Sequence, residues 1–124
     1  MRRSRPIGAG LLSLLLLAAA SGWTHAYLVK SVPARRAVLS KPPVRVQLWF
    51  NERLEARFSH VSVWDAEGRQ VDSGDLQIAP DDPKNLSVGV LTLMPGIYMV
   101  RFRVLSVDGH IVESQFPFTL RAQP

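Results

Sequence analysis

Hydrophobic and polar residues alternate with a period of two along most of the chain beyond residue 26, as in β-strands that bury one face. The alternation predicts strands at residues 44–50, 61–64, 88–93, 96–104 and 111–120, after an extended stretch at 27–32. Turn-forming residues separate these segments at 65–68, 94–96 and 108–109. Residues 81–83 are expected to form a loop with at most one helical turn.

The pattern predicts an all-β domain, because no segment has both the length and the periodicity of a long helix. Short strands spaced by turn signals are typical of a sandwich or a small barrel. Trp49 and Trp64 lie within predicted strands, and we expect them in the core. Met94 and Met99 lie in or beside a predicted strand, and we expect them to pack in the core rather than act as ligands.

The first 24 residues have the layout of a secretory signal peptide. Arg2, Arg3 and Arg5 precede an apolar run at residues 7–20, and small and polar residues follow. The alternative, a permanent membrane anchor, needs about 20 apolar residues, which is more than this run supplies. Residues 25–124 then form a single exported domain. Its net charge is +2 instead of +5, because three of the 15 basic residues leave and all 10 acidic residues stay.

The composition restricts both the partners and the metal chemistry. No basic patch with interleaved aromatic residues is visible, so nucleic acid is a poor candidate partner. There is no cysteine, so the domain has no disulfide and no thiolate ligand. A metal site would have to use histidine, carboxylate, backbone or the α-amine.

Two of the three histidines have neighbours that suggest a metal site. Asp108 precedes His110 by two residues, with Gly109 between them, so a sharp bend can bring both side chains to one cation. The alternative is an ordinary Asp-Gly hairpin turn. His25 would become the N-terminal residue if the signal peptide ends at residue 24, and its amine and ring could then chelate Cu(II) together. His60 is expected to be an ordinary polar residue.

The position of cleavage decides whether His25 is retained. Cleavage before His25 leaves Gly22 and Thr24 at the −3 and −1 positions. Cleavage after Ala26 leaves Thr24 and Ala26 there, which fits the small-residue rule better and makes Tyr27 the first residue. The second cleavage would remove the N-terminal chelate.

The chain resembles the CopC-type periplasmic copper-resistance proteins over nearly all of residues 25–120. The resemblance rests on a leading His25 with a Ser-x-Pro-Ala segment at 31–34, on a strand ending at Phe50 and Glu52, and on the Gly-x-Tyr…Ser-x-Asp-Gly-His block at 96–110. The Phe-Pro-Phe segment at 116–118 matches the last strand of the family. Ile111 and Ser114 depart from a Pro and a Gly that members often have there.

This resemblance implies an immunoglobulin-like Greek-key β-sandwich in the periplasm. It also implies a Cu(II) site built from His25, Asp108 and His110. Glu52 is then either an extra ligand or an outer contact of the site. The alternative for Glu52 is a solvated charge at the end of a strand. The implied function is copper resistance or copper delivery, with a CopD-type inner-membrane copper protein as partner. Catalysis is not expected.

Two other functions remain open from the sequence. A histidine brace also occurs in copper monooxygenases that cleave polysaccharides. Such enzymes need an open coordination position and a flat substrate face, often with exposed aromatic residues, and this domain is small for that work. If export removes His25, a metal-free sandwich used for adhesion or interaction becomes the better interpretation.

Overall fold

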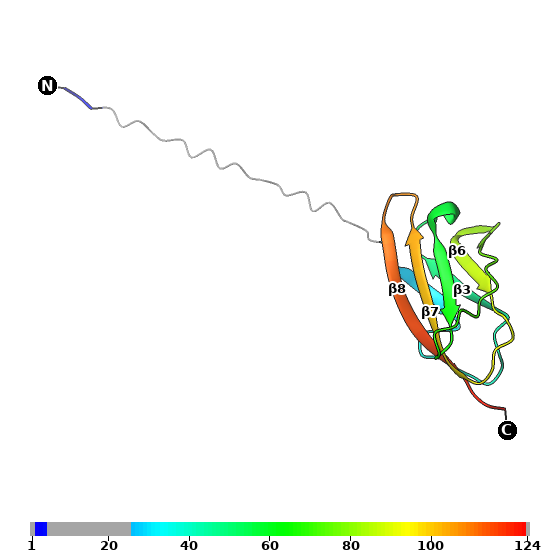
Figure 1. Ribbon diagram of the computed structural model, residues 1–124. Coiled ribbons are helices and arrows are strands. Elements are labelled where there is room, and N and C mark those ends of the chain that lie inside the picture. The colour runs from blue at the N-terminus through cyan, green and yellow to red at the C-terminus, as the bar shows by residue number, and fades with distance from the viewer. Residues whose placement is uncertain (1, 5–25, 124) are drawn as a thin grey trace.

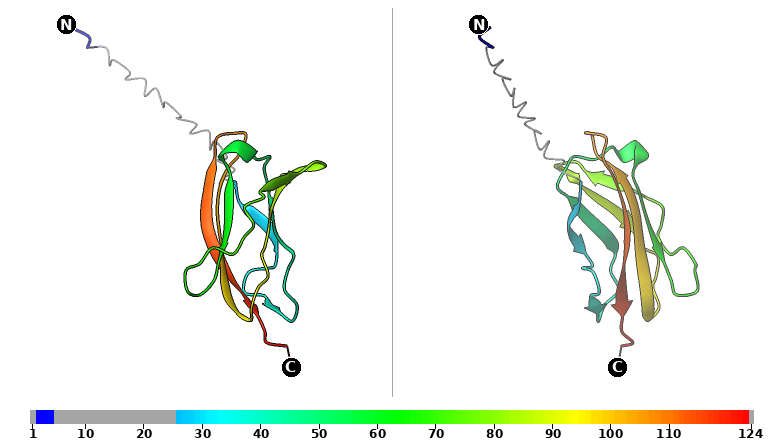
Figure 2. Two further views of the ribbon diagram at one scale, coloured as in Figure 1. Left: turned by 45° about the vertical axis from the view of Figure 1, so that its right-hand side comes forward. Right: turned by 90° about the vertical axis from the view of Figure 1, so that its left-hand side faces the viewer.

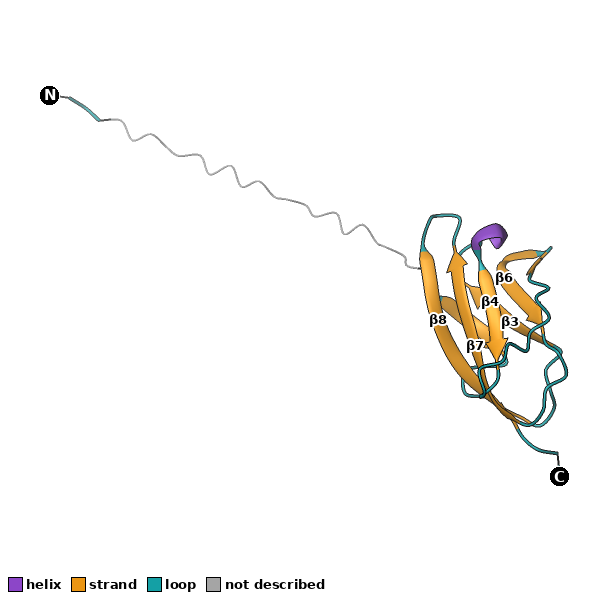
Figure 3. Cartoon of the chain, in the orientation of Figure 1, coloured by secondary structure: helices purple, strands orange, loops and turns teal. Residues whose placement is uncertain are grey.

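Eight strands form two packed sheets in the computed structural model, which describes residues 2–4 and 26–123 (Figures 1 and 2). The first sheet has the order β1-β3-β6-β5, with β1 at Leu28–Val32, β3 at Arg45–Phe50, β6 at Asp82–Gly89 and β5 at Gln77–Ala79. The second has the order β2-β8-β7-β4, with β2 at Val38–Leu39, β8 at Ile111–Leu120, β7 at Gly96–Leu105 and β4 at His60–Trp64. The described residues contain one short 3₁₀ helix, η1 at Ala56–Phe58 (Figure 3).

Alternation along the strands builds the core between the two sheets. In β3, buried Val46, Leu48 and Phe50 alternate with half-buried residues, and β7 buries every second side chain from Tyr98 to Val104. Phe50 of the first sheet meets Phe102 of the second edge to face, with ring centroids 5.5 Å apart. The period-two pattern in the sequence therefore corresponds to one shared apolar layer.

The expected fold class is confirmed: the chain is an all-β sandwich of the immunoglobulin-like Greek-key kind, with the chain crossing between the sheets after β1, β2, β3, β4 and β6. The predicted strands at 44–50, 61–64, 96–104 and 111–120 match β3, β4, β7 and β8 to within one residue. In the part of the chain that the structure describes, no helix has the length and apolar character needed to cross a membrane.

The predictions of a loop at residues 81–83 and of a strand at residues 88–93 are only partly right, because β6 spans residues 82–89. Asp82 begins β6 and pairs with Ala79 of β5, so the expected loop is a strand hairpin. The structure tolerates Pro83 because it is near the start of the strand, where a missing N–H matters least. Beyond Gly89, an isolated bridge joins Val90 to Asp72, and the Val90 N–H donates to the Val44 carbonyl at 3.0 Å. Residues 91–93 lie outside the strands.

The placement of the tryptophans and of one methionine also differs from expectation. Trp49 and Trp64 are half-buried on the outer faces of the sheets rather than in the core. Lys30 stacks over the ring of Trp49 at 4.8 Å, and Arg101 stacks over Trp64 at 5.1 Å. Cation–π contact makes such outward positions favourable. Met94 is 73% exposed, in the segment that precedes β7.

Candidate metal centre

The turn between β7 and β8 forms one end of the sandwich, together with η1 (Figures 1 and 3). The Ser106 N–H donates to the His110 carbonyl at 2.8 Å, and the Gly109 N–H donates to the Ser106 carbonyl at 2.9 Å. Gly109 has φ 85°, a conformation that glycine adopts without the strain a side chain would bring. The Asp-Gly pair therefore forms the expected tight turn, and this turn presents His110.

Glu52 lies directly against His110. The His110 Nδ1 is 3.3 Å from each oxygen of the Glu52 carboxylate. The two side chains are largely removed from solvent, with 11% of Glu52 and 26% of His110 exposed. A neutral His110 that donates from Nδ1 to this carboxylate has its lone pair on Nε2, so Glu52 selects the tautomer.

Ser106 contacts both Glu52 and His110. Its side chain is buried, with 1% of the residue exposed, and its hydroxyl oxygen accepts a hydrogen bond from the His110 N–H at 3.1 Å. Hydrogen bonding from the Ser106 hydroxyl, with a smaller contribution from His110, holds the pKa of Glu52 below its ordinary value despite partial burial. Glu52 is therefore a carboxylate at neutral pH. His110 is held both through its backbone N–H and through its ring.

Backbone pairing between distant segments brings Glu52 to the turn. The Glu55 N–H donates to the Leu105 carbonyl at 2.8 Å, and the Val107 N–H donates to the Arg53 carbonyl at 2.9 Å. A bridge between Leu54 and Ser106 lies between these two bonds. The segment that follows β3 is thus pinned to the end of β7, and Glu52 has little freedom to leave His110.

The beginning of the described domain is tied to the same end. The Tyr27 N–H donates to the Asn51 side-chain oxygen at 2.6 Å, and the Asn51 N–H donates back to the Tyr27 carbonyl at 3.2 Å. Leu28 then pairs with Phe50 as β1 begins. Tyr27 therefore lies beside the residue that immediately precedes Glu52.

The structure brings some of the predicted site residues together but not others. His110 and Glu52 are in contact, whereas Asp108 is exposed at the tip of the turn, and no hydrogen bond or ion pair between Asp108 and His110 is found in the described structure. His25 lies outside the described residues. Within residues 2–4 and 26–123, no three His, Cys, Asp or Glu side chains are grouped closely enough to hold a metal ion. His60 lies on the outer face of β4, opposite Arg103 of β7.

Sequence reasoning missed two residues of this end, Ser106 and Asn51. Ser106 stands in the Ser-x-Asp-Gly-His block, where a serine before an Asp-Gly turn is a signal for a local hydrogen bond. Asn51 carries no comparable signal, because its partner Tyr27 is 24 residues away in the chain.

Comparison with known sequences agrees with the resemblance found in the sequence. A profile of the CopC domain matches residues 28–121. The copper transport protein CutJ of Bacillus subtilis (strain 168) is 31% identical over 111 residues, which are 89% of this chain but 20% of CutJ. This chain thus spans only about a fifth of that relative. Protein YobA of Escherichia coli (strain K12) is 30% identical over 102 residues, with 82% of each chain covered.

Solved structures show the same similarity. The crystal structure of CopC from Methylosinus trichosporium OB3b superposes with a TM-score of 0.73 at 36% identity, covering 78% of this chain and 94% of that one. PcoC, a methionine-rich copper resistance protein from Escherichia coli, gives a TM-score of 0.65 at 28% identity, covering 78% of this chain and 99% of PcoC. Both proteins therefore share the sandwich over nearly their whole length.

Proposed function

The chain belongs to the CopC domain family, and from this membership we propose that it is an exported Cu(II)-binding protein used for copper resistance or for copper delivery. The names of its relatives CutJ and PcoC, a copper transport and a copper resistance protein, support copper as the cargo. We assign it a binding role without catalysis. The periplasm is the proposed location, and a CopD-type membrane copper protein is the proposed recipient.

One observation carries the proposal: the start of the domain and the Glu52–His110 pair meet at one end of the sandwich. Tyr27 is held beside Asn51, and Glu52 is the next residue along the chain. A residue two positions before Tyr27 has its Cα within about 7 Å of the Tyr27 Cα. A chain that begins at His25 would therefore have its amine and imidazole confined to the neighbourhood of His110.

We assign the roles of the ligands from their chemistry. His25 would bind through its α-amine and its ring, and His110 would bind through Nε2, the nitrogen that Glu52 leaves with the lone pair. Asp108 would add a carboxylate from the exposed tip of the turn. Three nitrogens and one carboxylate oxygen make a tetragonal N,O donor set, which suits Cu(II). Glu52 would act from outside the metal shell by orienting the imidazole.

Copper titration of the exported chain tests this assignment. Replacement of His110 by alanine removes a fixed nitrogen ligand, and we expect the Cu(II) affinity to fall by at least about 100-fold, more than the loss from an outer contact. Asp108→Ala should cost less, because that side chain is exposed and has to be brought to the metal. Isothermal titration in the presence of a competing chelator measures both affinities.

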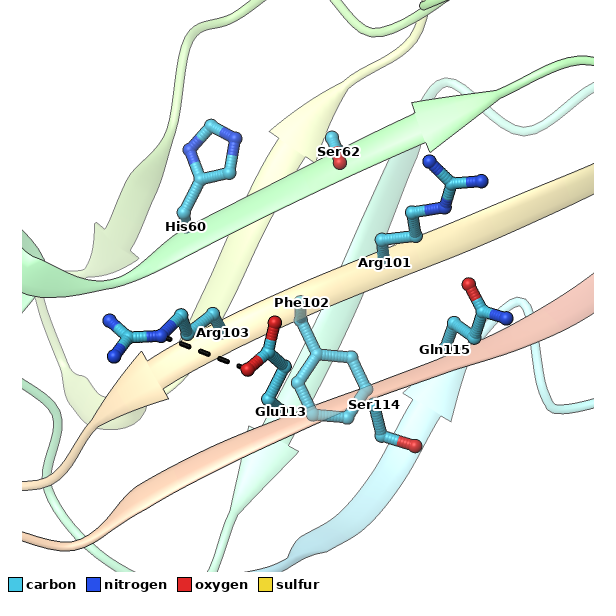
Figure 4. A pocket seen from close by; sticks show the side chains of 8 residues that line it. All are labelled: His60, Ser62, Arg101, Phe102, Arg103, Glu113, Ser114 and Gln115. Atoms are coloured by element: carbon cyan, nitrogen blue, oxygen red, sulfur yellow. Dashed lines mark ion pairs between the residues drawn. The ribbon is translucent and has the colours of Figure 1, made fainter. Parts of the chain in front are cut away.

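His60→Ala is the matched control for loss of an imidazole. His60 is exposed on the outer face of β4 (Figure 4), and no hydrogen bond or ion pair joins it to Glu52 or His110 in the described structure, so its replacement should leave Cu(II) affinity unchanged. If His110→Ala and His60→Ala bind copper equally well, the proposed site is wrong.

A further inference from the structure

Asn51 lies between the end of β3 and Glu52, and its side chain completes the last pairing beside the first sheet. In an antiparallel ladder, two hydrogen-bonded residues exchange both of their N–H···O=C bonds through the backbone. Here the Asn51 N–H donates to the Tyr27 carbonyl at 3.2 Å, but the Tyr27 N–H donates to the side-chain oxygen of Asn51, at 2.6 Å. The side-chain amide therefore has the place of a backbone carbonyl.

This exchange of acceptor matters because the main chain turns away from the sheet at the same point. β3 ends at Phe50, and residues 51 and 52 form a bend. Beyond the bend, both carboxylate oxygens of Glu52 lie 3.3 Å from the Nδ1 of His110. A side chain that reaches back lets the main chain leave the ladder for His110 without releasing the start of the domain.

A bulge separates the start of the domain from the regular part of its ladder. The register between β1 and β3 shifts between Leu28 and Lys30, so the first strand has one residue more than its partner there. That residue, Val29, is 59% exposed. The regular ladder therefore ends at Lys30, and the hydrogen bonds of Tyr27 hold the chain beyond the bulge.

The His110 half of the site is held by other contacts. Backbone hydrogen bonds of Arg53 and Glu55 join the segment after Glu52 to the end of β7. None of these bonds uses the side chain of Asn51. Loss of the Asn51 amide should therefore loosen the start of the domain and leave the contact between Glu52 and His110 in place.

We infer that Asn51 is a positioning residue for copper, whose side-chain amide holds the start of the domain in place before the metal binds. This role rests on the proposed copper function, in which His25 is the first residue of the chain and Tyr27 the third. A ligand group that is already held loses less conformational freedom on binding, so the affinity is higher. Adjacent side chains thus position the two halves of the site, Asn51 through the Tyr27 backbone and Glu52 through the His110 ring.

Copper titration of variants of the chain that begins at His25 tests this role. Asn51→Ala removes the acceptor and should lower the Cu(II) affinity about fivefold, the effect of one hydrogen bond. Asn51→Asp keeps an oxygen at the same position and should bind at least as tightly as the parent chain. Gln70→Ala is the matched control, because it removes an exposed side-chain amide that donates to Asp72 at 2.9 Å, between β4 and β5. It should bind copper like the parent.

Amide hydrogen exchange in the metal-free chain separates positioning from general destabilisation. Asn51→Ala should speed exchange of the Tyr27 N–H, because its acceptor is gone. Exchange of the His110 N–H, which donates to the Ser106 hydroxyl, should stay as in the parent chain. A loss of global stability would speed both.

The inference is overturned if Asn51→Ala binds copper as tightly as the parent, if Asn51→Asp binds as weakly as Asn51→Ala, or if exchange rises equally at both amides. Failure of the copper proposal gives a different result, because the parent chain itself then binds Cu(II) weakly, before any change at Asn51.

Discussion

The Ser106 hydroxyl is the residue-scale feature on which the metal centre depends. The hydroxyl oxygen accepts a hydrogen bond from the His110 N–H. The hydrogen bond between Ser106 and Glu52 is the main reason why the pKa of Glu52 lies below its ordinary value. Because Ser106 is buried, water cannot take over these two contacts. The imidazole and the carboxylate beside it are thus positioned by one small side chain.

Replacement of Ser106 by alanine should lower Cu(II) affinity by about tenfold, as is typical when an outer contact of a metal site is lost. The pKa of Glu52 should rise in this variant, because its main hydrogen bond is gone. Copper titration and a carboxyl-detected NMR titration measure the two effects.

Ser87→Ala is the control for Ser106→Ala. Ser87 is also buried, and its hydroxyl oxygen accepts hydrogen bonds from the Arg45 guanidinium at 3.1 and 3.3 Å, at the end of β3 remote from Glu52. It should lose stability by about 1 kcal/mol and keep its copper affinity. Equal affinities in the two variants would contradict the role of Ser106.

At the scale of elements, the β7–β8 turn decides where Asp108 and His110 point. Ten residue pairs hold β7 against β8, so the hairpin is rigid up to the turn, and the turn itself depends on Gly109 at φ 85°. A Cβ at this position would touch nothing within 4 Å, so a substitution acts through backbone conformation alone.

Gly109→Ala should therefore destabilise the domain by roughly 1–2 kcal/mol, the cost of a left-handed non-glycine residue, and should also weaken Cu(II) binding by moving the two ligands. Gly68→Ala is a close match, with φ 79° and equally open surroundings, but it lies in the turn after β4. Urea unfolding should show similar losses for both variants, while only Gly109→Ala changes the copper titration. A loss of copper affinity in both would indicate a general effect of destabilisation.

Elements with a clean alternation could be predicted from the sequence, whereas those defined by long-range pairing could not. β8 begins and ends as predicted, because its second half alternates clearly, with Phe116, Phe118 and Leu120 on the buried face. The start of β6 was not predicted, because Asp82 and Pro83 are typical of a loop and their pairing with β5 cannot be seen in the sequence. In the site, the block at 96–110 named Asp108 and His110, but the contacts of Ser106 and Asn51 depend on segments far apart in the chain.

At the scale of the whole molecule, acid stability depends on a carboxylate far from the metal centre. Hydrogen bonds from Ser73, Arg45 and the Gly89 N–H hold the pKa of Asp75 well below its usual range, in that order of importance. A carboxyl group with a depressed pKa in the folded state stabilises the fold above the pKa of the unfolded chain, about 3.9. That contribution is lost as the pH falls towards the folded-state value.

Asp75→Asn should therefore lower the melting temperature at pH 7. It should change the melting temperature less at about pH 2, where the stabilising contribution of the wild-type carboxyl group has begun to fall. Thermal unfolding across this pH range measures the effect. Asp81→Asn provides the comparison, since it removes an exposed carboxylate for which no hydrogen bond or ion pair is found in the described structure. A parallel pH profile for wild type and Asp75→Asn would contradict this account.

The most direct measurement compares Cu(II) binding by two mature chains, one beginning at His25 and the other at Tyr27. In the shorter chain the free amine is that of Tyr27, the nitrogen that donates to Asn51 at 2.6 Å, and no N-terminal imidazole is present. We predict tight binding by the chain that begins at His25, and an affinity lower by at least about 100-fold for the shorter chain, since it lacks two nitrogen ligands. Equal affinities would show that copper is held without the freed amino terminus, and the proposed site would have to be abandoned.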